Sequence, residues 1–353
     1  MNSLINLETA MYNKMTTKIL FILLLSLSTI YSHAQGTFTK YNIGDFIIEN
    51  GDTINDCTIG CRTFGKPNKD NSNTLVLLTW FAGKSIEYTG ATKPGNWADS
   101  TKFYVVVLDA LGNGVSSSPS NSSIQDKLKF PEFSIRDMVN SHHKLLTQFL
   151  NIDHVYAIAG YSMGGFQTFQ WIVSHPKYMD KAIVISGTPR LDEYDKLFYQ
   201  AEINVLELGI GTPSKQFEAF KIGVQIFVIN LFTPAYIQQQ YQKNHSEEFI
   251  KFWENYFLQN NFFDWTYQMK ALRNHDIYTT FNEPSNDIIS RVKANTLIIV
   301  NPQDRIVSPA PSIEIARQIN VKLIELNVDC GHFYYNCENK EISVKITEFL
   351  NLQ

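Results

Sequence analysis

The sequence predicts an α/β protein with a mostly parallel sheet and helices on both of its faces. Short continuous apolar runs recur along the chain, and helix-like patterns fall between them. Such runs are typical of strands that are buried on both faces of a parallel sheet, and their alternation with helices is typical of strand–helix–strand units. An aromatic-rich stretch without such a run predicts a helical insertion into this sheet.

Length and composition agree with a globular protein that has a large core. The chain has 353 residues, of which 44% are hydrophobic and 18% charged, and this composition excludes a disordered or collagen-like chain. Lys and Arg number 30 against 34 Asp and Glu, which leaves a net charge of −4. The chain therefore lacks the basic excess that nucleic-acid binding uses, and we expect no nucleic-acid partner.

The N-terminal segment is expected to be a signal peptide. Lys18 is followed by a short apolar run and then by Ser32 and Ala34, small residues at the −3 and −1 positions of a cleavage site before Gln35. The run is shorter than the ~20 residues of a membrane span, so an uncleaved anchor and a buried core helix are weaker alternatives. We predict that residues 1–34 are removed and that the mature chain is exported, periplasmic or secreted, with no stable membrane anchor.

The strands and helices of the sheet follow in order after this segment. Residues 38–65 alternate apolar and polar side chains around Asn50-Gly51, which predicts an antiparallel opening hairpin. Buried strands are predicted at 74–79, 103–108, 155–159, 182–186, 296–300 and 321–326. Helices are predicted at 134–150, 164–174, 312–319 and 341–350.

The aromatic-rich stretch, residues 190–285, is predicted to form a helical cap. Open α/β folds place their sites at the carboxyl edge of the sheet, and a cap over that edge encloses the substrate. Most of the aromatic side chains then form the core of the cap itself. The remaining segments, 35–189 and 286–353, form the sheet-containing core.

Cysteine usage leaves the disulfide pairing open. Cys57 and Cys61 lie in a strand-like stretch, where residues i and i+4 are about 13 Å apart, too far to bond to each other. Cys330 and Cys337 are spaced to close a small loop, and four unpaired thiols are the alternative. Neither pair has C-x-x-C spacing, and no H-E-x-x-H motif occurs, so we predict no metal and no cofactor.

The segment Gly160-Tyr161-Ser162-Met163-Gly164 carries the predicted nucleophile. It follows a predicted buried strand directly and opens a predicted helix, which is the setting in which G-x-S-x-G presents a serine at the strand end. Ser162 as a simple helix cap is the alternative interpretation. We predict that Ser162 is a catalytic nucleophile.

A base and an orienting acid are found at two later strand ends. His332 follows the last predicted strand, and Asp304 follows the strand before it. The order Ser162, Asp304, His332 is the one expected for an α/β-hydrolase triad. Asp329 is a rival acid, but it lies three residues from His332 on the same loop, so we favour Asp304.

The other histidines are weaker candidates for the base. His33 is lost with the signal peptide, and four more lie in predicted helices or beside a strand: His142, His143, His154 and His175. His245 and His275 belong to the predicted cap. For these two, substrate contact and a capping or surface role both remain open.

Two backbone N–H groups are expected to stabilise the oxyanion. Met163 supplies one, because it follows the nucleophile, and the loop 79–83 after the first buried strand supplies the other, with Phe81 favoured by position. Trp80 and Phe81 would also wall a small acyl pocket. We expect Trp80 and Tyr161 to contact the substrate.

Several motifs together resemble the homoserine O-acetyltransferase branch of the α/β-hydrolase superfamily. They are Phe133-Ser134-Ile135-Arg136-Asp137-Met138-Val139, Gly160–Gln167 continuing to Trp171, Phe263-Asp264-Trp265-Thr266-Tyr267 leading to His275-Asp276, Asp304 with Pro309, and Gly331-His332. The resemblance implies that Ser162 is acetylated by acetyl-CoA and passes the acetyl group to a hydroxyl acceptor.

Two departures from that branch bear on the acceptor. Those transferases typically have Asp directly after the catalytic His, where this chain has Phe333. They also carry an Arg for the carboxylate of the amino acid, whereas the stretch 190–207 offers only Arg190 and Lys196 as cations. Acetyl-CoA is moreover a cytoplasmic donor, so an exported chain is expected to use water.

The favoured prediction is therefore an exported serine hydrolase that acts on a small-molecule acyl ester through an acyl-enzyme intermediate. A homoserine O-acetyltransferase-like enzyme that uses acetyl-CoA is one alternative. A non-catalytic binding protein with the same fold is the other. The sequence leaves a homodimer open.

Overall fold

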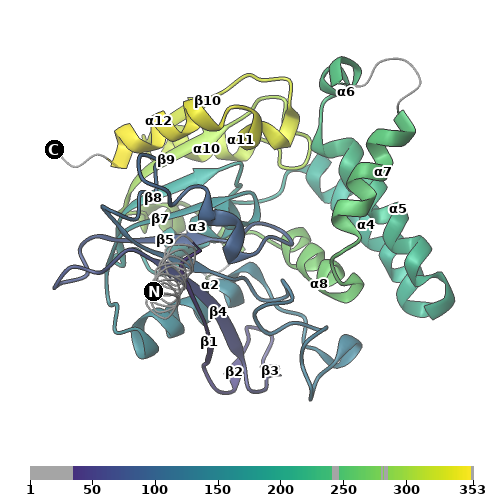
Figure 1. The fold of residues 1–353 in the computed structure, drawn as a ribbon, viewed down its shortest axis with the longest axis horizontal. Coiled ribbons are helices and arrows are strands. Elements are labelled where there is room, and N and C mark those ends of the chain that lie inside the picture. The colour runs from purple at the N-terminus through teal and green to yellow at the C-terminus, as the bar shows by residue number, and fades with distance from the viewer. Residues whose placement is uncertain (1–34, 241–245, 280, 282–284, 351–353) are drawn as a thin grey trace, which may run out of the picture.

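The computed structural model describes residues 35–240, 246–279, 281 and 285–350 (Figure 1). The predicted signal peptide, residues 1–34, lies outside these ranges, and so does His245. The strands are β1 Thr37–Asn42, β2 Phe46–Ile47, β3 Thr53–Ile54, β4 Thr58–Phe64, β5 Thr74–Leu78, β6 Tyr104–Leu108, β7 Val155–Tyr161, β8 Met179–Ile185, β9 Asn295–Val300 and β10 Lys322–Glu325.

One eight-stranded sheet has the order β1-β4-β6-β5-β7-β8-β9-β10. β4 is antiparallel to both β1 and β6, and all other neighbouring strands are parallel. The helices are α2 Ile135–Lys144, α3 Met163–Ser174, α4 Glu193–Gly211, α5 Gln216–Leu231, α6 Pro234–Gln240, α7 Ser246–Phe257, α8 Phe262–Arg273, α9 Ser285–Ser290, α10 Ala310–Gln318, α11 Tyr334–Cys337 and α12 Asn339–Leu350.

The antiparallel start predicted for residues 38–65 is confirmed, but it has two parts. β1 pairs with β4 at the edge of the sheet, with Tyr41 opposite Ile59. β2 and β3 form a separate short hairpin around Asn50-Gly51. The turn signal therefore belongs to the short hairpin, and the longer pairing joins strands on either side of it.

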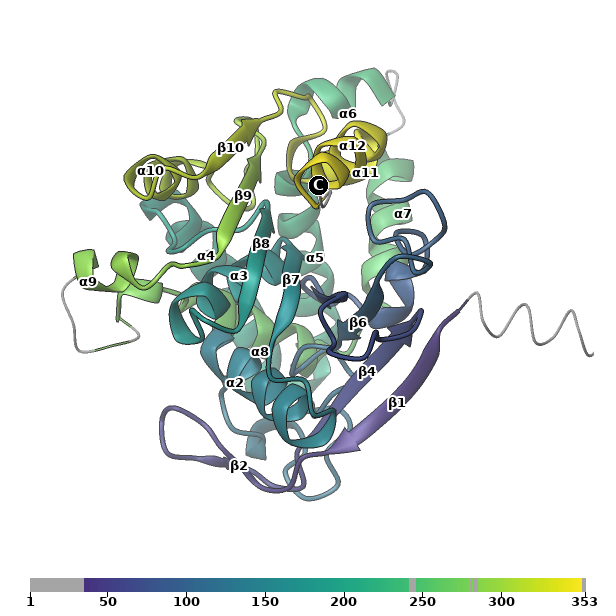
Figure 2. The ribbon, with the colours of Figure 1, turned by 90° about the vertical axis from the view of Figure 1, so that its left-hand side faces the viewer.

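The sheet is covered on both faces because consecutive side chains of a strand point to opposite sides. In β5, Val76 and Leu78 pack in one apolar cluster with α2, α3 and α10, whereas Leu75 and Leu77 pack in a second cluster with α12. All four side chains are fully buried. Figure 2 shows α10 and α12 on opposite sides of β9 and β10. The predicted α/β architecture is confirmed.

Helices α4 to α9 occupy the stretch between β8 and β9, in the segment for which the sequence predicts a cap. Figure 1 shows α4, α5, α7 and α8 grouped beside the sheet. Aromatic rings fill the space between them. The ring centroids of Phe220, Phe227 and Phe257 lie 5.6, 5.3 and 5.5 Å from that of Trp265.

No single helix within the described ranges combines the length and the apolar composition needed to cross a membrane. Two segments, Pro213–Leu231 and Pro234–Gln240, have the required length and apolar composition only when they are taken together. The chain bends by 95° between them. Val224 and Phe227, in the first segment, are buried within the protein.

One disulfide joins Cys330 to Cys337, the pairing that the sequence left open, with the two Cα atoms 6.6 Å apart. Cys57 and Cys61, on and beside β4, do not bond to each other, as their spacing predicts, and both thiols are free and buried. Burial raises the pKa of both free thiols to about 12, so they remain protonated and unreactive.

Candidate active site

Ser162 stands at the sharp turn between β7 and α3. Its backbone has φ 55° and ψ −123°, a conformation that residues other than glycine rarely adopt. Two glycines make this turn possible. A Cβ on Gly160 would lie 2.1 Å from the backbone of Gly164, and a Cβ on Gly164 would lie 2.4 Å from the carbonyl oxygen of Leu78. Backbone therefore packs directly against backbone, and the serine side chain projects at the strand end.

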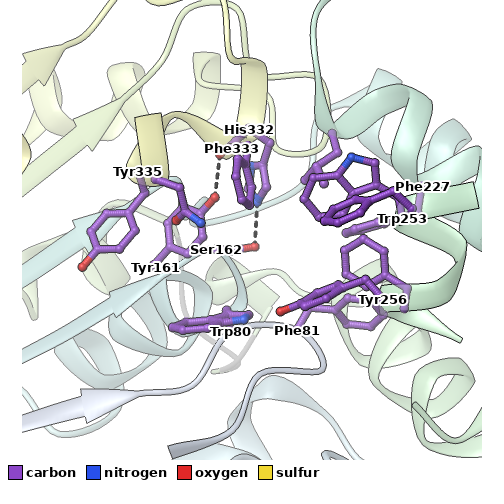
Figure 3. A pocket seen from close by; sticks show the side chains of 14 residues that line it. Trp80, Phe81, Tyr161, Ser162, Phe227, Trp253, Tyr256, His332, Phe333 and Tyr335 are labelled. Carbon is purple, nitrogen blue, oxygen red and sulfur yellow. Dashed lines mark hydrogen bonds between the residues drawn. The ribbon is translucent and has the colours of Figure 1, made fainter. Parts of the chain in front are cut away.

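Ser162, His332 and Asp304 form one hydrogen-bonded chain, and Figure 3 shows its link between Ser162 and His332. The Ser162 hydroxyl donates to His332 Nε2 over 2.9 Å, and His332 Nδ1 donates to Asp304 Oδ2 over 2.7 Å. The three residues follow β7, β10 and β9, whose carboxyl ends meet at one edge of the sheet. All three are buried. This arrangement leaves Nε2 as the acceptor for a serine proton.

The second carboxylate oxygen of Asp304 is also held. Oδ1 accepts the backbone N–H groups of Ile306 and Val307, at 3.0 and 2.9 Å. Asp329, the rival acid, is exposed, and its Oδ1 accepts instead from Gln303 Nε2 at 3.0 Å. Of the two carboxylates, the structure brings Asp304 to His332.

The remaining histidines that the structure describes make their contacts elsewhere. His275, one of the two histidines in the predicted cap, is buried, and its Nε2 lies 3.1 Å from the carbonyl oxygen of Thr188. Burial lowers the pKa of His275 to about 3, so the ring is neutral at pH 7. Substrate contact was one of its two expected roles, and it does not line the pocket next to Ser162.

A buried asparagine that the sequence analysis missed ties two site loops together. Asn301 directly follows β9, and its Nδ2 donates to the carbonyl oxygens of Val328 and Gly331, each over 2.8 Å. Its side chain is fully buried. Because Asn301 precedes Asp304 on one loop and Gly331 precedes His332 on the other, a single amide fixes the loop of Asp304 against the loop of His332.

Phe81 and Met163, the predicted oxyanion donors, lie in the loop after β5 and at the first residue of α3. Within the described ranges, neither backbone N–H donates a hydrogen bond. Free backbone N–H groups beside a nucleophile are suited to an oxygen that gains negative charge during the reaction.

Two glutamines hold the loop that carries Phe81. Gln167, on α3, donates from Nε2 to the carbonyl oxygen of Thr79 over 3.0 Å. Gln268, on α8, accepts the backbone N–H of Ala82 at 2.8 Å. The loop is therefore fixed both by α3, which begins directly after Ser162, and by α8, which belongs to the insertion between β8 and β9.

A pocket of about 310 Å³ opens in front of Ser162 (Figure 3). Trp80 and Tyr161, the predicted substrate contacts, both line it. None of the described residues that line it is Lys, Arg, Asp or Glu. The lining residues are Trp80, Phe81, Tyr161, Ser162, Phe227, Leu231, Phe252, Trp253, Tyr256, Phe257, His332, Phe333, Tyr335 and Asn336.

Tyr161 has a second contact that the sequence did not predict. Its hydroxyl donates to the backbone carbonyl of His332 over 2.5 Å, and its ring stacks on the His332 ring with centroids 5.4 Å apart. Burial raises the pKa of Tyr161 well above its usual value, so the hydroxyl stays protonated and remains a donor. Tyr161 therefore positions the histidine as well as lining the pocket.

Arg190 and Lys196, the two cations that the sequence offers for binding the carboxylate of an amino-acid substrate, do not line this pocket. Arg190 pairs with Glu314 at 2.9 Å, and Lys196 pairs with Glu193 at 2.7 Å. In the part of the chain that the structure describes, no three His, Cys, Asp or Glu side chains are grouped so that they could hold a metal ion.

A family model described as "alpha/beta hydrolase fold" matches residues 95–335. The chain belongs to the alpha/beta hydrolase fold family. A curated relative, an ethyl acetate hydrolase from Pseudomonas veronii, is 35% identical over 179 residues, which cover 49% of this chain and 50% of that protein. A homoserine O-acetyltransferase from Methanohalophilus mahii is 37% identical over 160 residues, which cover 40% of this chain and 33% of that protein. The chain thus spans half or less of the length of these two relatives.

This alpha/beta hydrolase is similar to a solved structure over nearly its whole length. An acetylester hydrolase from Corynebacterium glutamicum superposes with a TM-score of 0.84 at 23% identity, and the match covers 90% of this chain and 96% of that one. An identity this low establishes the fold alone. Together, the comparisons confirm the predicted α/β-hydrolase fold and the resemblance to the homoserine O-acetyltransferase branch.

Proposed function

We propose that this alpha/beta hydrolase is a serine esterase that hydrolyses small, uncharged acyl esters. One observation carries the proposal: the hydrogen-bonded chain from Ser162 through His332 to Asp304 opens into an aromatic pocket whose described lining has no charged side chain. Aromatic walls favour an apolar substrate, and the triad supplies a nucleophile with its base.

The reaction proceeds in two halves. Ser162 Oγ attacks the ester carbonyl carbon while His332 Nε2 takes the hydroxyl proton, and Asp304 stabilises the resulting imidazolium. The N–H groups of Met163 and Phe81 donate to the oxyanion. His332 returns the proton to the alcohol as its C–O bond breaks, which leaves Ser162 acylated. Water then attacks the acyl group by the same route and releases the carboxylic acid.

Transfer of an acetyl group from acetyl-CoA to homoserine is the second candidate, favoured by the matched relative with that name. A carboxylate placed in this pocket would meet no cation among the described lining residues, and burial of an unpaired charge is costly. Phe333 also occupies the position where that branch typically has Asp. These two features support water over an amino acid as acceptor.

The proposal is tested with the purified mature chain and its Ser162→Ala variant. We expect the wild type to hydrolyse p-nitrophenyl acetate without an added acceptor, and the variant to lose at least about a thousandfold in kcat. Thiol release from acetyl-CoA that requires homoserine, without ester hydrolysis, would establish the transferase instead. If Ser162 supports no turnover and does not react with a fluorophosphonate, the chain is a binding protein.

We also propose that the chain is exported after removal of residues 1–34. The Cys330–Cys337 disulfide supports this, because disulfides persist in oxidising compartments. Mass spectrometry of the protein recovered outside the cytoplasm should give an N-terminus at Gln35 or its cyclised form. Recovery of the full-length chain from the cytoplasm alone would contradict export.

A further inference from the structure

We propose that the Cys330–Cys337 disulfide is a positioning element that holds His332 and one wall of the pocket in their working arrangement. The bond closes the segment 330–337, which we call the disulfide loop. Four lining residues of the pocket lie inside this loop: His332, Phe333, Tyr335 and Asn336. The inference rests on the proposed esterase activity only where its test measures kcat. The hydrogen-exchange measurement described below does not depend on that activity.

The disulfide loop is attached to the sheet through two tyrosines. Tyr334 is fully buried, and its hydroxyl donates to the carbonyl oxygen of Ile299 in β9 over 3.0 Å. The Tyr335 hydroxyl accepts from Trp97 Nε1 at 3.2 Å, and its ring stacks on that of Tyr161 with centroids 5.1 Å apart. Movement of this loop would therefore also disturb Tyr161, which holds the His332 backbone.

The disulfide loop also packs on the turn between α5 and α6 and on α7. The Phe333 ring lies 5.3 Å from that of Phe232 and 5.4 Å from that of Trp253. Gly331, with φ 65°, lies so close to this turn that a Cβ would approach the Leu231 carbonyl oxygen to 2.9 Å. The disulfide loop thus packs between the sheet and the helices whose side chains line the pocket.

Local backbone structure alone is insufficient to fix this loop. α11 comprises Tyr334–Cys337 only, and a helix of one turn is unstable without outside support. The disulfide joins the last residue of that turn to Cys330, two residues before His332. Without the bond, the turn can fray and carry Nε2 away from Ser162 Oγ. A displacement of about 1 Å between reacting groups can lower a rate by about a hundredfold.

The bond is open to chemical test because Cys337 is exposed, whereas Cys57 and Cys61 are buried. With dithiothreitol, the S–S bond breaks, two thiols form, and the reagent becomes a cyclic disulfide. We expect kcat for p-nitrophenyl acetate to fall by about ten- to a hundredfold on reduction and to recover on re-oxidation. Alkylation followed by mass spectrometry identifies the reduced cysteines.

Two variants serve as matched controls. Cys337→Ser should show the low kcat without reductant and should not respond further to dithiothreitol. The double variant Cys57→Ala/Cys61→Ala retains the disulfide and should keep the full response. Both kcat and KM are measured for each protein, together with near-UV circular dichroism and the melting temperature.

The inference is overturned if the fully reduced protein keeps kcat and KM within about twofold of the oxidised values, or if kcat falls only where near-UV dichroism shows global loss of structure. Hydrogen exchange of residues 331–336 gives a readout that needs no turnover. Faster exchange after reduction supports the positioning role, and unchanged exchange rejects it. Absence of esterase activity in both redox forms defeats the esterase proposal, while the exchange measurement still decides the role of the disulfide.

Discussion

At the scale of single residues, Asn301 supports the site although it does not line the pocket. Its Nδ2 donates to the carbonyl oxygens of Val328 and Gly331. Among the residues that the structure describes, no other side chain donates to these two oxygens. Both acceptors belong to the loop that leads to His332. Because Asn301 is fully buried, water cannot replace its amide without a rearrangement of that loop.

Asn301→Ala is therefore expected to lower both stability and turnover. Two carbonyl groups, one buried and one half-buried, lose their donor, and each unsatisfied group costs about 1–3 kcal/mol, so the free energy of unfolding should fall by about 2–6 kcal/mol. The freed loop should lower kcat about tenfold. Urea unfolding and ester hydrolysis measure the two effects.

Gln303→Ala is the control for this variant. It lies two residues away, and its side chain bonds at the surface to Asn327 and Asp329. We expect it to stay within about 0.5 kcal/mol of the wild type. Equal effects of the two substitutions would remove the special role of Asn301.

The sequence is sufficient to predict that side chains meet when each of them directly follows a strand of the parallel sheet. Ser162, Asp304 and His332 each follow a predicted strand, and parallel strands bring their carboxyl ends to one edge, so their meeting could be expected. Asn301 also follows a strand, but its partners are carbonyl groups of a distant loop. Backbone acceptors leave no sequence signal, and the bond is visible only once the two loops are placed side by side.

At the scale of elements, α4 is joined to the loop of Asp304 through a buried carboxyl group. Asp195, in the first turn of α4, accepts the backbone N–H of Ser308 at 3.0 Å. Burial, with Asp192 and Asp304 nearby, raises the pKa of Asp195 to about 8. The folded protein therefore holds this proton at neutral pH, whereas the unfolded chain releases it near pH 4.

This difference sets the sign of a pH effect on stability. Between about pH 4 and pH 8 the folded state binds more protons at this site than the unfolded state, so its contribution to stability falls as pH rises. Asp195→Asn stays neutral and can still accept from Ser308. The variant should exceed the wild type by a few kcal/mol in unfolding free energy at pH 8, with the gap closing toward pH 4.5.

Urea unfolding at the two pH values measures this gap. The matched control is Glu193→Gln, on the same turn of α4, where the carboxylate is exposed and pairs with Lys196. It should show a gap near zero. A constant difference between Asp195→Asn and the wild type at both pH values would contradict the assigned protonation.

Strands were predicted correctly from continuous apolar runs. Prediction failed where the structure depends on which segments of the chain pair with each other. Each of the six runs predicted as buried strands contains a strand. Five of these strands are largely buried, but burial was wrongly predicted for 321–326, because β10 is an edge strand and its four residues are exposed or half-buried. The division of the opening hairpin into two pairings was missed. The disulfide was also left open, since four cysteines permit three pairings and the choice depends on how the loop after β10 folds back.

At the scale of the whole molecule, the pocket is a joint product of the sheet and the helices between β8 and β9. Phe81 comes from the loop after β5, and Phe227 comes from α5, yet their rings lie 5.5 Å apart. Both also pack on Trp265 of α8, at 4.4 and 5.3 Å. The sequence predicts the position of the nucleophile, but the size of the pocket depends on how these helices pack against the sheet-containing core.

The pocket size leads to a prediction about substrate length. Phe227→Ala removes a ring from the wall opposite Ser162, and the space gained should admit longer acyl chains. Each added methylene that finds apolar contact is worth about 1 kcal/mol or more, so kcat/KM for p-nitrophenyl hexanoate relative to acetate should rise at least about tenfold. Phe217→Ala, on the same helix but exposed and away from the pocket, should leave this ratio unchanged. If both variants keep the wild-type ratio, Phe227 does not limit the acyl chain, and the limit must lie with Phe81 and Trp80 on the core side.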